Sequence, residues 1–251
     1  MYYLMPICVS FSPGPRNDAR TSVTTQTTRS MHPRLLLFLL LGILPLLPIV
    51  HAQTKGDPTR WQSDIAAFRK ADSLQPPPTR GIVFTGSSSI RLWHDLTDRF
   101  AGRRIVNRGF GGSWLSDVVH YFPQLVVPYR PRTIVVYAGE NDIADGRPAE
   151  GLVQDVEALL ALRQKHLPKS KLVFIALKPS PSRAEKLGEV RRANALIRER
   201  LAGERRAVFV DVFTPMLDAQ GAAREELFGP DRLHMNPKGY DLWTQVLAPY
   251  L

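Results

Sequence analysis

The sequence predicts a single three-layer α/β/α domain around a five-stranded parallel sheet, with a flavodoxin-like strand order. Apolar runs such as residues 133–138 and 171–177 are continuous rather than alternating, which is typical of strands buried on both faces. Amphipathic helical patterns separate these runs, and such alternation favours right-handed βαβ crossovers within one sheet. With 251 residues, the chain is long enough for one sizeable core.

We predict that residues 81–251 form this domain and that residues 53–80 precede it as a lead-in helix, over 61–71, and a proline-rich linker. The expected strands are residues 82–85, 104–107, 133–138, 171–177 and 207–211. The expected helices are residues 89–100, a segment ending near 122, and residues 148–166, 184–201 and 237–251. In such a sheet, ligands bind at the carboxyl ends of the strands.

The composition excludes several classes of protein. The net charge is +10, but the basic residues are spread along the chain apart from short pairs at 103–104, 191–192 and 205–206. A nucleic-acid partner is not expected, because no basic stripe with interleaved aromatic residues is present. A solvated basic surface is the favoured interpretation, and attraction to anionic surfaces stays open. Cys8 is the single cysteine, which excludes an intramolecular disulfide and a cysteine nucleophile in the domain. No zinc-ligand pattern is present.

The N-terminal part has the pattern of a targeting segment. Residues 35–50 are an apolar run of 16 that follows Arg34 and ends near Ala52, as in a secretory signal peptide. We therefore predict a signal peptide over residues 31–52, cleavage after Ala52, and export to the periplasm or the extracellular space. Residues 1–30 are predicted to be a misassigned extension, with translation starting at Met31. The alternative is an uncleaved segment that anchors the protein; otherwise a membrane is expected only as a transient partner of the signal segment.

Four short motifs follow strands or enter the last helix, and each carries chemistry. Ser88 lies in Gly86-Ser87-Ser88 on a strand-to-helix turn, where a hydroxyl is exposed next to helix amides. Gly112 ends a glycine-rich loop, and Asn141 follows the third strand. Asp231 and His234 are three residues apart, so that the carboxylate can orient the imidazole. Taken singly, the serine turn is better explained by a helix cap, and the glycine loop and the Asn141 segment are explained by ordinary turns. The Asp231–His234 pair is explained equally well by a capping aspartate and a surface histidine.

Together, in this order, the motifs resemble those of the SGNH (GDSL-type) serine hydrolase family, over most of the chain from residue 81 onward. The resemblance implies a serine esterase of the SGNH hydrolase fold. It assigns Ser88 as nucleophile, His234 as base and Asp231 as the acid of the triad. It also implies an oxyanion hole made by the amides of Ser88 and Gly112 and the side chain of Asn141. The chain departs from the family at Ser87, which stands at the place of the usual aspartate.

The activity that this resemblance implies is ester hydrolysis through an acyl-enzyme, without a metal or a cofactor. The expected substrate is a small-molecule, glycan or lipid ester, and the sequence does not choose between an acetylated sugar, a lipid or a thioester. One alternative is a non-catalytic carbohydrate- or envelope-binding module on the same fold. A nucleotide-binding flavodoxin-like protein is a third possibility, although the glycine loop lacks the P-loop spacing.

Several other residues near the motifs receive predictions from their positions alone. Phe110 and Trp114 are expected to form pocket walls, whereas Trp93 is expected in the core. Glu140 and Asp142, beside Asn141, are expected to be loop and capping groups. Residues 178–183 either line the pocket or simply connect two elements, and the histidines outside the motif are expected at the surface: His94, His120 and His166.

Overall fold

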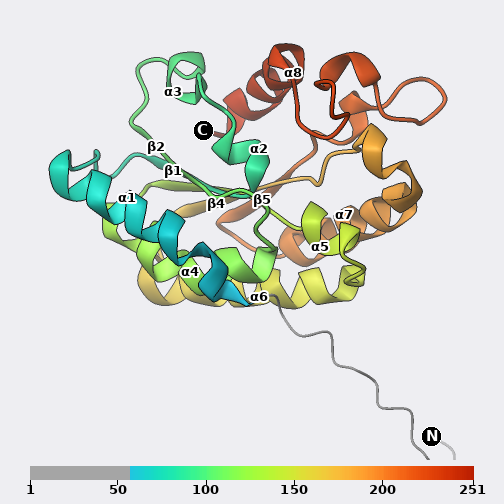
Figure 1. The fold of residues 1–251 in the computed structure, drawn as a ribbon. Coiled ribbons are helices and arrows are strands. Elements are labelled where there is room, and N and C mark those ends of the chain that lie inside the picture. The colour runs from blue at the N-terminus through green and yellow to red at the C-terminus, as the bar shows by residue number, and fades with distance from the viewer. Residues whose placement is uncertain (1–56) are drawn as a thin grey trace, which may run out of the picture. The chain divides into compact units, whose positions relative to one another are not determined.

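The computed structural model describes residues 57–251. The predicted extension, signal peptide and cleavage site lie outside the described residues. The described part contains one five-stranded parallel sheet with the strand order β2-β1-β3-β4-β5 (Figure 1). This is the predicted three-layer architecture with the flavodoxin-like order, so the predicted fold class is confirmed.

The strands end level with one another, which decides where the site is built. They are β1 (Ile82–Gly86), β2 (Ile105–Gly109), β3 (Thr133–Tyr137), β4 (Lys171–Ile175) and β5 (Ala207–Val210). In the central part of the sheet, Gly86 of β1 is in register with Gly109 of β2 and Tyr137 of β3. The segments that follow these three strands therefore leave the sheet side by side.

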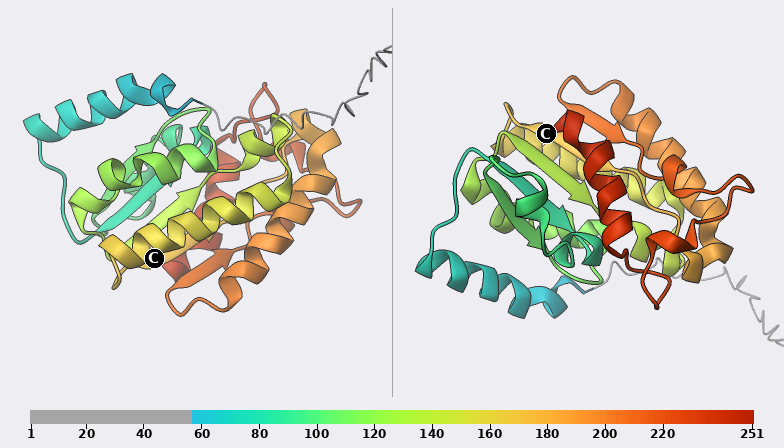
Figure 2. Two further views of the ribbon diagram at one scale, coloured as in Figure 1. Left: turned by 90° about the horizontal axis from the view of Figure 1, so that it is seen from below. Right: turned by 90° about the horizontal axis from the view of Figure 1, so that it is seen from above.

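Helices cover both faces of the sheet. The helices α4, α6 and α7 lie along one face, and α2, α3 and α8 lie on the other (Figure 2). The lead-in helix α1 runs beside α4, where the Tyr121 hydroxyl of α4 donates to the carbonyl of Pro58, at 2.7 Å. The helix bounds are α1 Gln62–Leu74, α2 Ser88–Arg91, α3 Leu96–Arg99, α4 Leu115–Leu125, α5 Glu140–Ala144, α6 Ala149–His166, α7 Leu187–Ala202 and α8 Pro237–Leu247. Short 3-10 helices complete the described part: η1 Pro58–Trp61, η2 Val127–Tyr129, η3 Pro181–Lys186, η4 Thr214–Met216, η5 Glu225–Leu227 and η6 Ala248–Tyr250.

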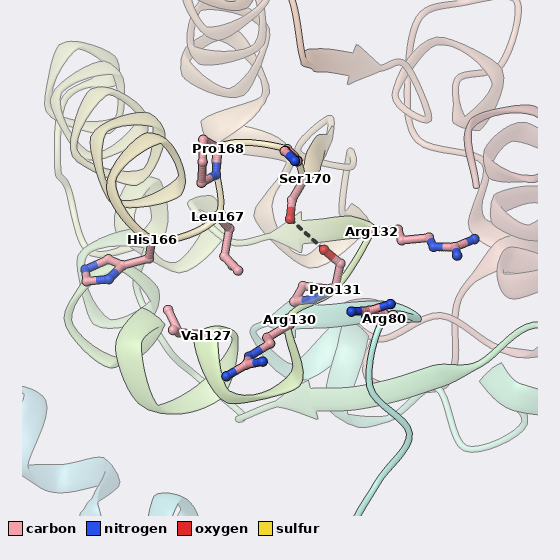
Figure 3. Close-up of a pocket in the computed structure, with 10 residues that line it drawn as sticks. Arg80, Val127, Arg130, Pro131, Arg132, His166, Leu167, Pro168 and Ser170 are labelled. Carbon is pink, nitrogen blue, oxygen red and sulfur yellow. Dashed lines mark hydrogen bonds between the residues drawn. The ribbon is translucent and has the colours of Figure 1, made fainter.

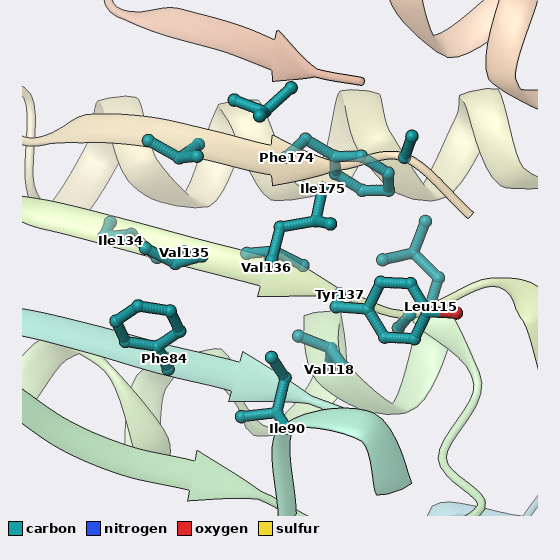
Figure 4. Close-up of a cluster of buried hydrophobic side chains, with 14 of the residues drawn as sticks. Phe84, Ile90, Leu115, Val118, Ile134, Val135, Val136, Tyr137, Phe174 and Ile175 are labelled. Carbon is teal, nitrogen blue, oxygen red and sulfur yellow. The ribbon is translucent and has the colours of Figure 1, made fainter. Parts of the chain in front are cut away.

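The core consists of side chains that the central strands present to both helical layers. All five residues of β1 and all five of β3 are buried, as the continuous apolar runs predicted (Figure 4). On the α8 side, Trp93 lies 1% exposed among Phe84, Phe100, Tyr240 and Trp243, with ring centroids 5.0–5.9 Å from its own. The prediction that Trp93 belongs to the core is thus confirmed.

Some predicted helix bounds are wrong. The expected helix over residues 89–100 is broken into α2 and α3, because the intervening turn inserts the Trp93 ring into the aromatic cluster. The expected helix over 184–201 starts only at Leu187. Before it, the η3 turn includes Arg183 with non-helical backbone angles, φ −127° and ψ 31°. Tertiary packing outweighs local helical preference at both places.

No helix within residues 57–251 is long and apolar enough to cross a membrane.

Candidate active site

The structure brings Ser88, Asp231 and His234 together at the carboxyl edge of the sheet. His234 Nε2 lies 3.0 Å from Ser88 Oγ, and His234 Nδ1 lies 2.6 Å from Asp231 Oδ2. The serine comes from the end of β1, whereas the other two residues come from the loop before α8, 146 positions away from Ser88 in the case of the histidine. Such a chain of hydroxyl, imidazole and carboxylate can let the ring accept the serine proton while the carboxylate holds the opposite nitrogen.

Asp231 is prepared for this role by the backbone around it. Its other oxygen, Oδ1, accepts hydrogen bonds from the amides of Leu233 and His234, each at 3.0 Å. The Leu233 amide is the largest cause that lowers the pKa of Asp231, to about 2, and the bonds from His234 act in the same direction. The carboxylate is therefore ionised over the whole neutral range and can balance an imidazolium.

The turn that presents Ser88 depends on Gly86. This glycine has φ +138°, and a Cβ atom there would lie 1.9 Å from the carbonyl oxygen of Tyr137. Its neighbour Ser87 is buried, stands at the N-cap position of α2 without a side-chain capping bond, and donates its amide to that same carbonyl oxygen, at 2.9 Å. The turn leaves Ser88 as the first residue of α2, half-buried with its hydroxyl on the pocket side.

Three hydrogen-bond donors belong to residues that line the same pocket as the Ser88 hydroxyl. Within the described residues, the backbone amides of Ser88 and Gly112 donate no hydrogen bond to another group. Gly112 has φ +77°, a left-handed conformation that glycine adopts without strain. The Asn141 side chain is the third donor, and all three residues line the same pocket. Backbone amides without another acceptor, together with a side-chain amide at the same pocket, are groups of the kind that can stabilise an oxyanion.

The orientation of the Asn141 amide is determined by its two partners. Its Nδ2 donates to the carbonyl oxygen of Ser113 at 3.1 Å, and its Oδ1 accepts from Arg183 at 3.1 Å. A guanidinium only donates and a carbonyl only accepts, so the reverse orientation would lose both bonds. The second Nδ2 hydrogen is left for the pocket.

Arg183 belongs to a buried polar network centred on Glu140. The Glu140 carboxylate accepts from Lys178 Nζ at 2.8 Å and from the hydroxyls of Ser180 and Tyr137 at 2.5 Å each, and it lies 3.3 Å from Arg183. Burial alone would raise the pKa of Glu140, but the positive charges of Lys178 and Arg183 outweigh it and lower that pKa. This network anchors the loop after β4 to the loop after β3, and thereby holds Arg183 against Asn141.

A pocket of about 410 Å³ opens in front of the serine. Leu233 contributes the one aliphatic side chain of the lining. Arg91, which is exposed, and Asp64, from the lead-in helix, place opposite charges at its wall. Gly111 also lines the pocket, and the Arg91 guanidinium lies over it. The other lining residues are those described above: Ser88, Gly112, Asn141, Arg183 and His234.

Comparison with known proteins identifies the family of the chain. Residues 79–242 match the model of the GDSL-like lipase and acylhydrolase family. The chain belongs to this family. Platelet-activating factor acetylhydrolase IB subunit alpha1 from Homo sapiens is 29% identical to this acylhydrolase over 199 residues, which cover 77% of the chain and 82% of the human protein. The Bos taurus protein of the same name gives the same figures.

Solved structures of other proteins share the fold. A Streptococcus pneumonia protein, provisionally named a platelet activating factor, superposes with a TM-score of 0.69 at 22% identity, covering 76% of this chain and 93% of that one. A mutant of the acetylxylan esterase Axe2 from Geobacillus stearothermophilus gives 0.56 at 11%, covering 69% and 94%. Likeness at this level of identity bears on the fold alone.

Two predicted pocket walls of this acylhydrolase are wrong. Phe110 is fully buried beneath the glycine loop, and Trp114 is 9% exposed with its Nε1 donating to Asp145 at 2.6 Å. Neither side chain lines the pocket. Instead Trp61, from η1, covers Gly112, where an added Cβ would lie 3.2 Å from the indole. An aromatic residue next to a glycine loop packs as readily beneath the loop as beside the pocket.

The Trp61 indole is held by the element that begins at the glycine loop. Its Nε1 donates to Asp117 Oδ2 at 2.9 Å, and Arg60 lies 3.2 Å from the same oxygen. Asp117 also caps α4 by accepting from the Trp114 amide at 2.9 Å. The lead-in segment precedes the residues that the family model matches. None of the four motifs therefore indicated that Trp61 lies next to the site.

Glu140 and Asp142 are more than loop and capping groups. Glu140 is 5% exposed in the network described above, and Asp142, fully buried, pairs with Arg147 and accepts from the Leu115 amide at 3.0 Å. The loop over residues 178–183 fulfils both of its predicted alternatives: Arg183 lines the pocket, and Lys178 is buried within the connection. The histidines for which a surface position was expected, His94, His120 and His166, are exposed. No cluster of three or more possible metal ligands occurs within residues 57–251.

Proposed function

We propose that this acylhydrolase is an exported serine esterase that cleaves carboxylic esters of short acyl groups through an acyl-enzyme. The observation that carries the proposal is the position of His234 between Ser88 Oγ and the Asp231 carboxylate, at 3.0 Å and 2.6 Å. In the proposed roles, Ser88 is the nucleophile, His234 the general base and Asp231 the group that orients the imidazole.

The reaction proceeds in two balanced halves. Ser88 Oγ attacks the ester carbonyl carbon while its proton passes to His234 Nε2, and the resulting oxyanion accepts hydrogen bonds from the amides of Ser88 and Gly112 and from Asn141. The bond to the alcohol oxygen then breaks, and His234 returns the proton to that oxygen. A water molecule repeats the sequence on the acyl-enzyme, releasing the acid and restoring the serine. These steps use side chains and backbone amides of this chain alone.

The size and lining of the pocket support a short acyl group. A space of about 410 Å³ with one aliphatic side chain, Leu233, offers little apolar surface to a long acyl chain. Two of the similar proteins are named for acetyl esters, an acetylhydrolase and an acetylxylan esterase. We therefore propose acetyl esters as the substrate class, with an alcohol part that extends out of the pocket.

Labelling with a fluorophosphonate probe tests the nucleophile. We expect the native protein to be labelled and the Ser88→Ala variant not to be, whereas Ser182→Ala, which removes an exposed serine of the same sheet edge, is labelled like the native protein. Hydrolysis of p-nitrophenyl acetate should follow the same pattern. An unlabelled native protein, or a Ser88→Ala variant that retains wild-type hydrolysis, would refute the catalytic assignment and favour a binding module.

Export is proposed from the sequence over residues 31–52. Fractionation of cells that make the full chain should place the protein outside the cytoplasm, and its N-terminus should begin at Gln53. An N-terminal peptide from residues 1–30 in the precursor would refute the predicted start at Met31.

A further inference from the structure

The edge of the sheet opposite the pocket gathers exposed basic side chains. Each of the five strands is preceded, within four residues of its start, by arginine or lysine. Eight of these side chains are exposed, and together they are called the basic face: Arg80, Arg103, Arg104, Arg130, Arg132, Lys169, Arg205 and Arg206.

Acidic residues do not neutralise this basic face. Among the five connections that lead into the strands, Glu204 is the single acidic residue, and it pairs with Arg200 at 2.9 Å. Leu251 also borders the face. Within residues 57–251, none of the eight cations forms an ion pair with an aspartate or glutamate side chain.

The opposite edge of the sheet, where Ser88 lies, carries nearly equal numbers of basic and acidic residues. The connections that follow the strands hold five lysines and arginines against six aspartates and glutamates. Over residues 57–251 there are 28 basic and 22 acidic residues, and without the basic face the numbers are 20 and 22. The positive charge of the described part is therefore located on the basic face.

The basic face contains two shallow hollows. One, of about 550 Å³, is lined by Arg80, Arg130, Arg132 and Lys169 around a floor that includes Leu167 (Figure 3). The second, of about 420 Å³, shares Arg80 and Arg132 with the first and adds the pair at 103–104. The arginines thus surround small partly apolar depressions instead of standing on a smooth surface.

The backbone holds two of these arginines in an unfavourable conformation. Arg80 has φ +59° and Arg130 has φ +45°, in the left-handed region that glycine adopts without strain. The Arg80 amide donates to the carbonyl oxygen of Tyr129 at 3.0 Å, which ties the two turns together. Two arginines with strained backbone conformations thus line the same hollow. Such strain is often retained where a side chain binds a ligand, which suggests that these two arginines bind one.

We propose that the basic face binds an anionic phospholipid bilayer and holds the protein with the Ser88 pocket turned away from the membrane. Guanidinium groups form paired hydrogen bonds with phosphate oxygens, which makes arginine the fitting residue for lipid phosphates. The cations extend across five adjacent strands, roughly 20 Å at the usual strand spacing, so they match an extended surface better than a single small molecule. A single-stranded nucleic acid would need aromatic rings on which bases stack. Tyr129, beside Arg130 in the chain, is buried with its hydroxyl bonded to Asp72, so the one exposed aromatic ring in the lining of the first hollow is that of His166.

Vesicle flotation with the full chain tests the proposal. The protein is mixed with vesicles of phosphatidylcholine alone or of phosphatidylcholine and phosphatidylglycerol in equal parts, at two salt concentrations. We expect stronger binding to the phosphatidylglycerol vesicles and a loss of this difference at high salt, because exposed charges are screened. The chain is used before removal of the proposed signal peptide, so the apolar run 35–50 is present in every sample and the difference between the two kinds of vesicle isolates the charge effect.

Two double variants test the basic face itself. Each basic residue near an anionic membrane changes the partition coefficient about fivefold, so Arg130→Gln with Arg132→Gln should weaken binding roughly 25-fold. Arg103→Gln with Arg104→Gln is a second variant in a separate turn, in case the first pair disturbs the fold. The matched control, Lys70→Gln with Lys238→Gln, lowers the net charge equally at exposed positions outside the basic face and should bind like the native protein.

Three outcomes would overturn the proposal. The first is equal binding to both kinds of vesicle at low salt. The second is an equal loss of binding in the control variant, which would make the effect one of net charge. The third is retention on immobilised duplex DNA or heparin under conditions where phosphatidylglycerol vesicles are not bound, which would assign the basic face to another polyanion.

Discussion

Replacing Arg183 by methionine should lower the turnover of this acylhydrolase without a matching change in substrate binding. Arg183 contacts no atom of the proposed triad, but its guanidinium fixes the carbonyl side of the Asn141 amide at 3.1 Å. Methionine keeps much of the side-chain length and removes the donors. The Asn141 amide then retains its bond to Ser113 and loses the partner that determines which way it faces.

The expected loss of kcat depends on how many of the hydrogen bonds that orient the Asn141 amide remain in the variant. Losing an oxyanion-hole donor outright costs roughly 10²–10³ in kcat. Because one of the two bonds that orient Asn141 survives, we expect Arg183→Met to lower kcat by roughly 10–100-fold, a loss of about 1.4–2.7 kcal/mol of transition-state stabilisation. KM should stay within about twofold, since the oxyanion is formed only in the transition state.

A double-mutant cycle with Asn141→Ala separates a positioning role from direct contact with substrate. Steady-state hydrolysis of p-nitrophenyl acetate is measured for both single variants and for the double variant. If Arg183 acts through Asn141, the double variant should be about as slow as Asn141→Ala alone. Arg183→Lys, which restores a charge near Glu140 without the forked donor geometry, should recover stability more than turnover.

Two results would refute this reasoning. Additive losses in the cycle would mean that Arg183 acts on the substrate independently of Asn141. A raised KM at unchanged kcat would make it a binding residue of the pocket.

Three further perturbations should have measurable effects. Trp61→Ala removes the half-buried indole that packs on Phe110 and bonds Asp117. We expect this variant to lower the free energy of unfolding, measured by urea denaturation, by about 2–3 kcal/mol. A loss below about 0.5 kcal/mol would contradict the described packing. Gly112→Ala forces a side chain to φ +77° and towards that indole, so kcat should fall at least tenfold, and combining it with Trp61→Ala should relieve only the steric part. Asp231 has its pKa lowered from 3.8 to about 2, so its contribution to stability is present above about pH 4 and is lost as the pH falls towards 2. The difference in Tm between the native protein and Asp231→Asn should therefore shrink over that range, and a constant difference would contradict the lowered pKa.

The parts of the fold and site that follow strands could be predicted from the sequence. A parallel sheet brings the carboxyl ends of its strands to one edge, so Ser88, Gly112 and Asn141 only had to follow three apolar runs to become neighbours. The Asp231–His234 spacing within one loop added the base and its orienting carboxylate. Local patterns sufficed because topology supplied the long-range contacts.

Residues that depend on packing between distant segments could not be predicted in this way. Trp61 reaches Gly112 from a segment before the first strand. Arg183 lies in a connection for which lining the pocket was one of two expected alternatives, but its bond to Asn141 depends on the η3 turn, which no short motif indicates. Phe110 shows the converse case: its place beside the glycine loop indicated a pocket wall, but the ring packs beneath the loop against Tyr121. Neither the side of a loop on which a ring packs nor a contact across 40 residues is encoded in a short motif.

The distribution of charge follows the same topological rule as the motifs. Along the chain the basic residues are dispersed, because a strand and two short helices separate Arg80 from the pair at 103–104, and further elements separate these from the pair at 205–206. In a parallel sheet, however, residues that precede the strands all meet at the amino edge. A repeated placement of arginine before each strand therefore produces one concentrated face, just as the repeated placement of polar motifs after the strands produces one site. If both edges have the proposed functions, the sheet separates attachment from catalysis by its own length, and charge-removing variants at the amino edge should leave hydrolysis of a soluble ester unchanged.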